Sequence, residues 1–146
     1  MALTPPITPA DKESDRHAWA MLQRKRPEVD WNKSSLRRAD LTGEGKLARV
    51  MLGHDDERHV WIGVVRPESR EGAFNPHVVN VGQVESLSLS FHKLESATDC
   101  LVAENTPLDG CRPRKGQRGL TFAIADAPPQ RLYWHAGEKR FAVWVP

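Results

Sequence analysis

The sequence predicts a mostly β domain of the α+β class, in which an N-terminal helix covers an antiparallel sheet of hairpins. Three observations lead to this prediction. A helix start and a matching stop lie near the N-terminus, and short β-branched or aromatic runs separated by turn residues follow them. The length of 146 residues is enough to bury one core. The hairpins would form a sandwich-like arrangement or part of a propeller.

The expected helix begins at Thr8 and Pro9 and runs to about Arg24. Thr8 can cap its first turn, Pro9 suits the first helical position, and Pro27 disfavours helix at the residue before it. Its apolar side is a narrow stripe of three residues: Ala18, Met21 and Leu22. We therefore expect this helix to lie on a sheet surface rather than inside a core.

Strand-like runs begin at about Leu36. The expected strands are 47–52, 59–65, 78–81, 87–91, 120–125, 131–135 and 140–145. The first two would form a hairpin around the polar turn 53–58, and the last two a second hairpin around the turn 136–139. Two long loops remain, 66–77 and 103–119. None of the apolar runs is long enough to span a bilayer.

The first residues indicate an exported domain. Residues 1–8 are rich in Pro and Thr, lack the basic and apolar regions of a signal peptide, and are interpreted as a linker or expression-derived tail before a single domain over 9–146. We expect an export signal or lipoprotein leader in the precursor, which would allow a lipid anchor. The expected location is periplasmic or extracellular.

The two cysteines, Cys100 and Cys111, favour the same location. Closing about a dozen residues with a disulfide would stabilise the fold by about 3 kcal/mol, and such bonds persist in oxidising compartments. Two unrelated buried thiols are the alternative. The spacing fits neither a C-x-x-C redox motif nor a four-ligand zinc site.

The turn from Asp40 to Gly45 resembles the start of a calcium loop, in which alternating oxygens and a sharp glycine turn wrap the ion. Asp40, Thr42 and Glu44 are the candidate ligands. Thr42 is a weaker donor than a carboxylate, and Ala48 and Met51 occupy the positions where later ligands are expected. A purely structural turn is therefore the alternative, and no cofactor is required.

The second long loop carries a basic run that suits an acidic partner, and a basic loop that is merely solvated is the alternative. Its candidate binding residues are Arg112, Arg114, Lys115 and Arg118. The stretch 69–74, with Arg70 and Phe74, is the second candidate. A formal net charge of +2 is too balanced to indicate nucleic acid or an anionic membrane as partner. No G-x-S-x-G elbow is present, so we expect binding rather than catalysis.

Several of these segments resemble a broad group of small periplasmic bacterial proteins. The resemblance rests on the leading helix, the Asp40–Gly45 turn, the cysteine pair, and an ending that runs from Gly119-Leu120-Thr121-Phe122 through Tyr133-Trp134 to Phe141-Ala142-Val143-Trp144. Members of that group look like lysozyme inhibitors of the invertebrate type and like immunity proteins against secreted peptidoglycan-cleaving toxins. Calcium loops also occur in that class.

The resemblance implies a β-rich inhibitor that inserts a loop into the active-site cleft of a lysozyme-like hydrolase. Acidic catalytic residues of that cognate toxin would attract Arg or Lys. The chain itself would then not be an enzyme. The alternative is a cell-wall glycan-binding domain or a small hydrolase, in which exposed Trp31, Trp61 or Trp134 would stack on sugar rings.

Overall fold

The structure, a computed structural model, describes residues 8–66, 76–83, 87–94, 108, 110–124 and 128–144. Within these ranges the chain forms one helix followed by eight strands. Their bounds are α1 (Pro9–Lys25), β1 (Asp30–Ala39), β2 (Ala48–His54), β3 (His59–Val65), β4 (His77–Gln83), β5 (Leu87–Lys93), β6 (Arg118–Ile124), β7 (Gln130–His135) and β8 (Arg140–Trp144).

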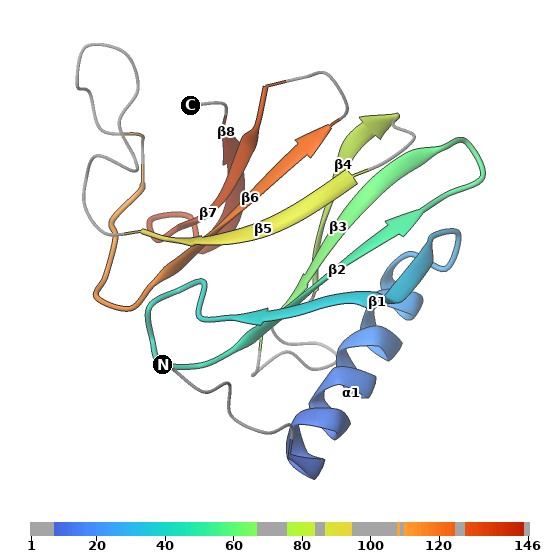
Figure 1. Ribbon diagram of the computed structural model, residues 1–146, viewed down its shortest axis with the longest axis horizontal. Helices are drawn as coiled ribbons and strands as arrows, with labels where there is room; N and C mark the ends of the chain where they lie inside the picture. Colours follow the sequence, from blue (N-terminus) through green and yellow to red (C-terminus); the bar gives the residue numbers. More distant parts are fainter. Residues whose placement is uncertain are drawn as a thin grey trace.

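The strands form two four-stranded sheets in chain order, β1-β2-β3-β4 and β5-β6-β7-β8. Every neighbouring pair is antiparallel. Figure 1 shows the two sheets facing each other, with α1 against the outer side of the first sheet. The predicted mostly β fold with a covering helix is therefore confirmed, and of the two arrangements expected, the sandwich is the one found.

Two apolar clusters hold these three layers together. Between the sheets, Val50 and Ile62 of the first sheet share one core with Leu120, Phe122 and Leu132 of the second. A separate cluster lies between α1 and the outer face of the first sheet: Ala18, Met21, Leu22, Val29, Trp31, Met51 and Val65. Because both faces of the first sheet are covered, β2 is buried along six consecutive residues.

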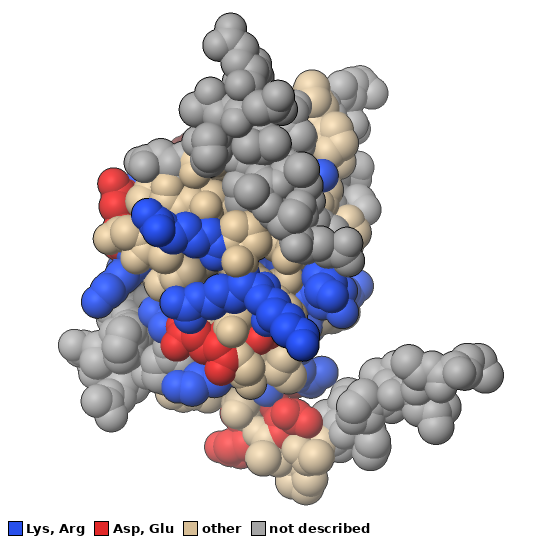
Figure 2. Space-filling view, turned by 90° about the vertical axis from the view of Figure 1, so that its left-hand side faces the viewer, with Lys and Arg blue, Asp and Glu red and all other residues tan. Residues whose placement is uncertain are grey.

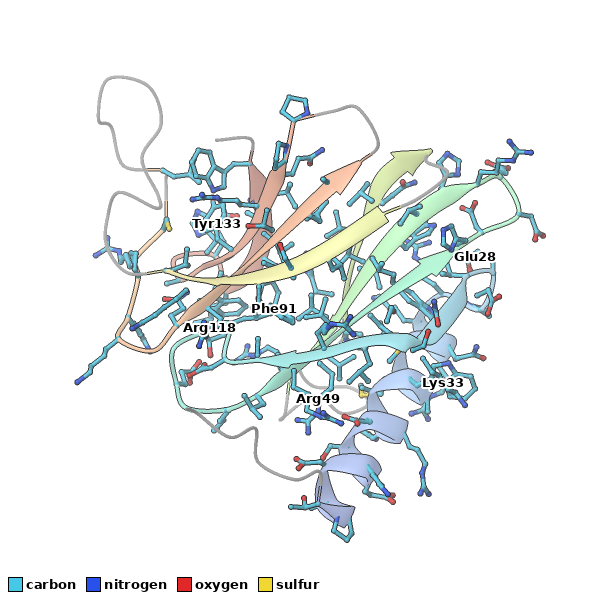
Figure 3. All side chains as sticks on the ribbon, in the orientation of Figure 1. Glu28, Lys33, Arg49, Phe91, Arg118 and Tyr133 are labelled. Atoms are coloured by element: carbon cyan, nitrogen blue, oxygen red, sulfur yellow. The ribbon has the colours of Figure 1, made fainter. Side chains whose placement is uncertain are left out.

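Helix α1 starts as predicted. The Thr8 hydroxyl accepts from the Asp11 amide at 3.1 Å, and the Asp11 carboxylate accepts from the Thr8 amide in return at 3.1 Å, which forms a capping box. Further along the helix, Asp15 forms ion pairs with Arg38 and with Arg49, whose side chain is only 8% exposed. These charges tie the helix to β1 and β2 beside the apolar cluster (Figure 3).

β1 was not predicted as a strand. The strand pairs with β2 at Asn32 and again at Arg37, and the register shifts between them. Inside this bulge the Ser35 hydroxyl donates to the Asn32 carbonyl at 2.6 Å and accepts from the Leu52 amide at 2.8 Å. The bulge interrupts the alternation of apolar and polar residues from which a strand is recognised.

The other elements lie close to their predicted bounds. Strand β3 covers the expected residues, and β2, β4, β5, β6 and β7 differ from the prediction by only a few residues at their ends. The expected ends at residues 125 and 145 lie outside the described residues. In the part of the chain that the structure describes, no helix has the length and apolar character needed to cross a membrane.

Candidate binding surface

The basic loop predicted from the sequence lies at the surface, next to the end of β5. Its four candidate residues are all exposed: Arg112, Arg114, Lys115 and Arg118. Lys93 is exposed as well and is the register partner of Arg118 across β5 and β6. We call these five residues the basic patch. Lys and Arg gather in a band across this side of the molecule (Figure 2), and Arg118 is labelled in Figure 3.

One end of the loop is fixed to the β7–β8 hairpin. Cys111 forms an isolated β-bridge with His135, and the Ala136 amide donates to the Gly110 carbonyl at 3.2 Å. Gly110 has a φ of +74°, and a Cβ there would lie 2.1 Å from the His135 ring. Only glycine fits this approach, so the entry to the loop has one conformation.

The other end is held through Gln117, which is only 2% exposed. Its side-chain amide donates to the Leu41 carbonyl at 3.0 Å, and its side-chain oxygen accepts from the Arg114 amide at 2.8 Å. The Gln117 carbonyl also accepts from Leu94 at 3.0 Å. The buried side chain of Gln117 thus holds the loop against the segment of Leu41, and its backbone carbonyl holds the loop against Leu94. Sequence reasoning did not single out this residue.

The predicted calcium loop lies directly beneath the basic loop. The Arg118 amide donates to the Asp40 carbonyl at 2.7 Å, and a Cβ on Gly43 would lie 2.7 Å from the Cβ of Arg114. The two segments that the sequence singled out independently are therefore packed together. Any change in the Asp40–Gly45 turn would be transmitted to the basic patch.

The candidate calcium ligands have other contacts. Asp40 accepts from the backbone amides of Gly43 at 2.8 Å, Glu44 at 3.2 Å and Gly45 at 2.9 Å, so these amides hold the turn in shape. The Glu44 carboxylate lies 3.7 Å from Arg66. Thr42 is buried. Among the described residues, no group of three or more His, Cys, Asp or Glu side chains could hold a metal. Calcium binding stays a prediction.

Within the described ranges, none of the five cations of the basic patch pairs with a carboxylate. Lys115 and Gly116 form the turn at the tip, and Gly116 has a φ of +83° that favours glycine. The loop thus presents exposed charges with no carboxylate partner among the described residues, on a backbone that is held at both ends.

Of four further predicted residues, the structure describes only Cys111. Cys111 is disulfide-bonded, but Cys100 lies outside the described residues, so the pairing of these two stays a prediction. Arg70 and Phe74 also lie outside the described residues. The structure therefore gives no account of the second candidate stretch.

The tryptophans named for sugar stacking are engaged within the fold. Trp31 is 3% exposed, and its indole donates to the Leu22 carbonyl at 3.0 Å. The guanidinium of Arg26 lies 4.9 Å from the ring centre of Trp61, and that of Arg66 lies 4.7 Å from the ring centre of Trp134. Trp31 is not exposed, which corrects the expectation for that residue.

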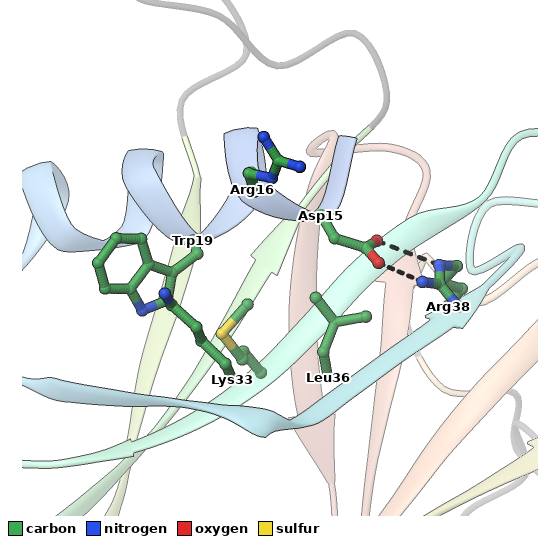
Figure 4. Close-up of a pocket in the computed structure, with 7 residues that line it drawn as sticks. Asp15, Arg16, Trp19, Lys33, Leu36 and Arg38 are labelled. Atoms are coloured by element: carbon green, nitrogen blue, oxygen red, sulfur yellow. Dashed lines mark hydrogen bonds and ion pairs between the residues drawn. The ribbon is translucent and has the colours of Figure 1, made fainter. Parts of the chain in front are cut away.

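A cavity of about 320 Å³ lies between α1 and the bulged part of β1 (Figure 4). Trp19 and Lys33 close one end, with the Lys33 ammonium 3.9 Å from the ring centre, and the Asp15–Arg38 pair closes the other. Leu36 and Met51 also line it. It exists because the bulge lifts β1 away from the helix, and no sequence pattern indicated it.

The chain thus combines a β-sandwich, a covering helix and a basic patch on an anchored loop. Comparison with models of protein families found no match for this chain. Comparisons with curated proteins and with solved structures found none either.

Proposed function

We propose that this protein binds and occludes an acidic active-site cleft of a secreted peptidoglycan-degrading, lysozyme-like effector, as a periplasmic immunity protein or inhibitor. The observation that carries the proposal is the anchoring of the basic loop at both ends, at Gly110 against His135 and at Gln117 against Leu41. Its exposed cations extend from a fixed base, as an element that enters a cleft requires.

Anchoring matters because fixing the backbone of a flexible loop on binding costs about 1–2 kcal/mol for each residue that becomes ordered. A backbone already fixed by Gly110, Gln117 and Arg118 has lost that freedom on folding. Arg112 and Arg114 can then form charge-assisted hydrogen bonds with carboxylates, which are about twice as strong as neutral ones. Catalytic carboxylates in a hydrolase cleft are partners of this kind.

The test is inhibition of purified lysozyme-like hydrolases that use paired carboxylates. We expect at least one to be inhibited with nanomolar affinity. The double variant Arg112→Glu/Arg114→Glu should weaken that inhibition by about 100-fold or more, mainly through slower association, because the reversed charges repel the cleft. A double variant with the same charge change, Arg24→Glu/Lys25→Glu on the exposed end of α1, is the matched control and should inhibit normally.

The proposal fails if the protein leaves the whole panel active, or if both double variants weaken inhibition equally. Fluorescence quenching by soluble muropeptides in the absence of any hydrolase would favour a cell-wall glycan-binding domain instead. Cleavage of peptidoglycan by the protein alone would favour a hydrolase.

A further inference from the structure

A second cavity, of about 180 Å³, lies where the end of β3 and the start of β4 meet the turn between β7 and β8. Its lining residues come from four segments of the chain: Val64, Arg66, His77, Trp134, Lys139, Arg140 and Phe141. None of them belongs to the basic patch. Four of the seven carry basic groups, and none carries a carboxylate.

The two arginines are oriented by Trp134, which also lines the pocket, and by two carboxylates outside the lining. Arg66 lies over Trp134, with its guanidinium carbon 4.7 Å from the ring centre, and 3.7 Å from the Glu44 carboxylate. Arg140 is paired with Glu138 in the same turn. The described lining thus carries three permanent cations, Arg66, Lys139 and Arg140, and the described part of the chain places no carboxylate in that lining.

Lys139 occupies a position in the turn that favours glycine. Its φ is +53°, in the left-handed region, where a residue with a Cβ pays a conformational cost. Strain of this kind persists where the surrounding structure holds it, and it is frequent at ligand sites. The turn does contain a glycine, Gly137, but two residues earlier. The Lys139 ammonium group thus belongs to a residue in the left-handed region that lines the pocket.

The size and walls of the cavity restrict its ligand. Ligand pockets usually enclose about 300–1,000 Å³, so 180 Å³ suits one small ionic group rather than a whole drug-sized molecule. Trp134 and Phe141 form an apolar edge, with ring centres 4.9 Å apart. We propose that this pocket binds a phosphoryl group, either as free phosphate or on a larger carrier. A phosphate monoester carries a charge of about −1.5 to −2, which suits three cations better than a single carboxylate does.

His77 reports directly on this pocket. Burial, followed by the charge of Arg140 and, more weakly, that of Lys25, lowers the pKa of its imidazole, while a hydrogen bond with the Phe141 backbone opposes the shift. Arg66 and Lys139 also line the pocket that it faces. A bound dianion would favour the imidazolium, so occupancy should raise the pKa of His77 again.

The experiment follows the His77 ring signals by NMR while the full chain is titrated with inorganic phosphate, with His77→Gln used to assign them. We expect saturable shifts and a higher His77 pKa at saturation. Lys139→Gly should weaken phosphate binding by about tenfold or more, as expected for the loss of a charge-assisted contact, while the melting temperature stays unchanged or rises. Arg112→Ala in the basic patch removes the same charge outside the pocket and should bind normally.

Further titrations distinguish the sources of the group. If glycerol phosphate binds more tightly than inorganic phosphate, the carrier is soluble, and if only vesicles with phosphatidic acid bind, it is a lipid headgroup. The proposal is overturned if neither phosphate nor any carrier moves the His77 signals. It is also overturned if Lys139→Gly and Arg112→Ala have the same effect on binding, since the interaction would then be with net charge rather than with the pocket.

Discussion

Replacing Gln117 by alanine tests whether the basic loop is held in place by its buried amide. The change removes two hydrogen bonds, from the side chain to the Leu41 carbonyl and from the Arg114 amide to the side chain. The Leu41 carbonyl belongs to a residue 2% exposed, so leaving it unsatisfied costs about 1–3 kcal/mol. Arg114 is exposed, so water can replace its partner and the cost is nearer 1 kcal/mol.

The free energy of unfolding should therefore fall by about 2–4 kcal/mol, which leaves a typical domain folded. Urea denaturation measures this loss, and hydrogen exchange at the Arg114 amide should become faster. Gln23→Ala on α1, which also shortens a glutamine but at a half-buried position, is the control and should change stability by less than about 0.5 kcal/mol.

Binding to the inhibited hydrolase adds a third measurement. Gln117→Ala removes no charge from the basic patch, so it should weaken the complex only by disordering the loop. If stability and Arg114 exchange match those of the Gln23→Ala control, Gln117 does not hold the loop and the anchoring argument is wrong.

Three further changes test the layers and the second cavity. Gly63→Ala should lower the free energy of unfolding by about 1–3 kcal/mol, because its Cβ would lie 2.5 Å from a Leu22 methyl in the packed outer cluster; urea denaturation checks it. Arg49→Met should cost about 2 kcal/mol in the same assay, since Asp15 loses a buried partner but keeps Arg38. His77→Gln should abolish the pH dependence of the free energy of unfolding that His77 causes. The pKa of His77 is lowered in the folded state, so the unfolded chain binds the proton more readily. The contribution of His77 to wild-type stability is therefore complete above pH 6.5 and is lost as pH drops towards the folded-state pKa.

Local signals predicted the elements well where each strand or helix is regular. The cap at Thr8 and the stop before Pro27 bound α1, and turn residues bound most strands. β1 escaped because its bulge between Asn32 and Arg37 removes the period of two. Half of the β1 residues are exposed, and the buried Trp31 packs in the cluster under α1, which a local sequence window does not show.

The candidate binding surface was predicted in part for a related reason. The cations of the basic loop are close together in the sequence, so composition alone reveals them. Gln117 lies among these charged residues, so a sequence-based prediction would place it on the surface as well. It is buried because Leu41, far away in the chain, presents a carbonyl to its amide. The cavity at His77 was missed likewise, since Val64, His77 and Lys139 meet only after the two sheets pack.

The near-neutral net charge of the chain does not show that the carboxylates and the cations of the basic patch have different roles in the fold. Asp11 caps the helix, Asp15 pairs with two arginines, Asp40 accepts three backbone amides, and Asp55 accepts from two amides and the Trp61 indole. These carboxylates keep their charge, but internal contacts fix where that charge lies. The cations of the basic patch have no such role within the described residues, so a net charge of +2 understates the attraction for anions on that face. Because exposed charges are screened beyond about 10 Å at 0.1 M salt, association through this face should slow as salt is added, more than the net charge would indicate.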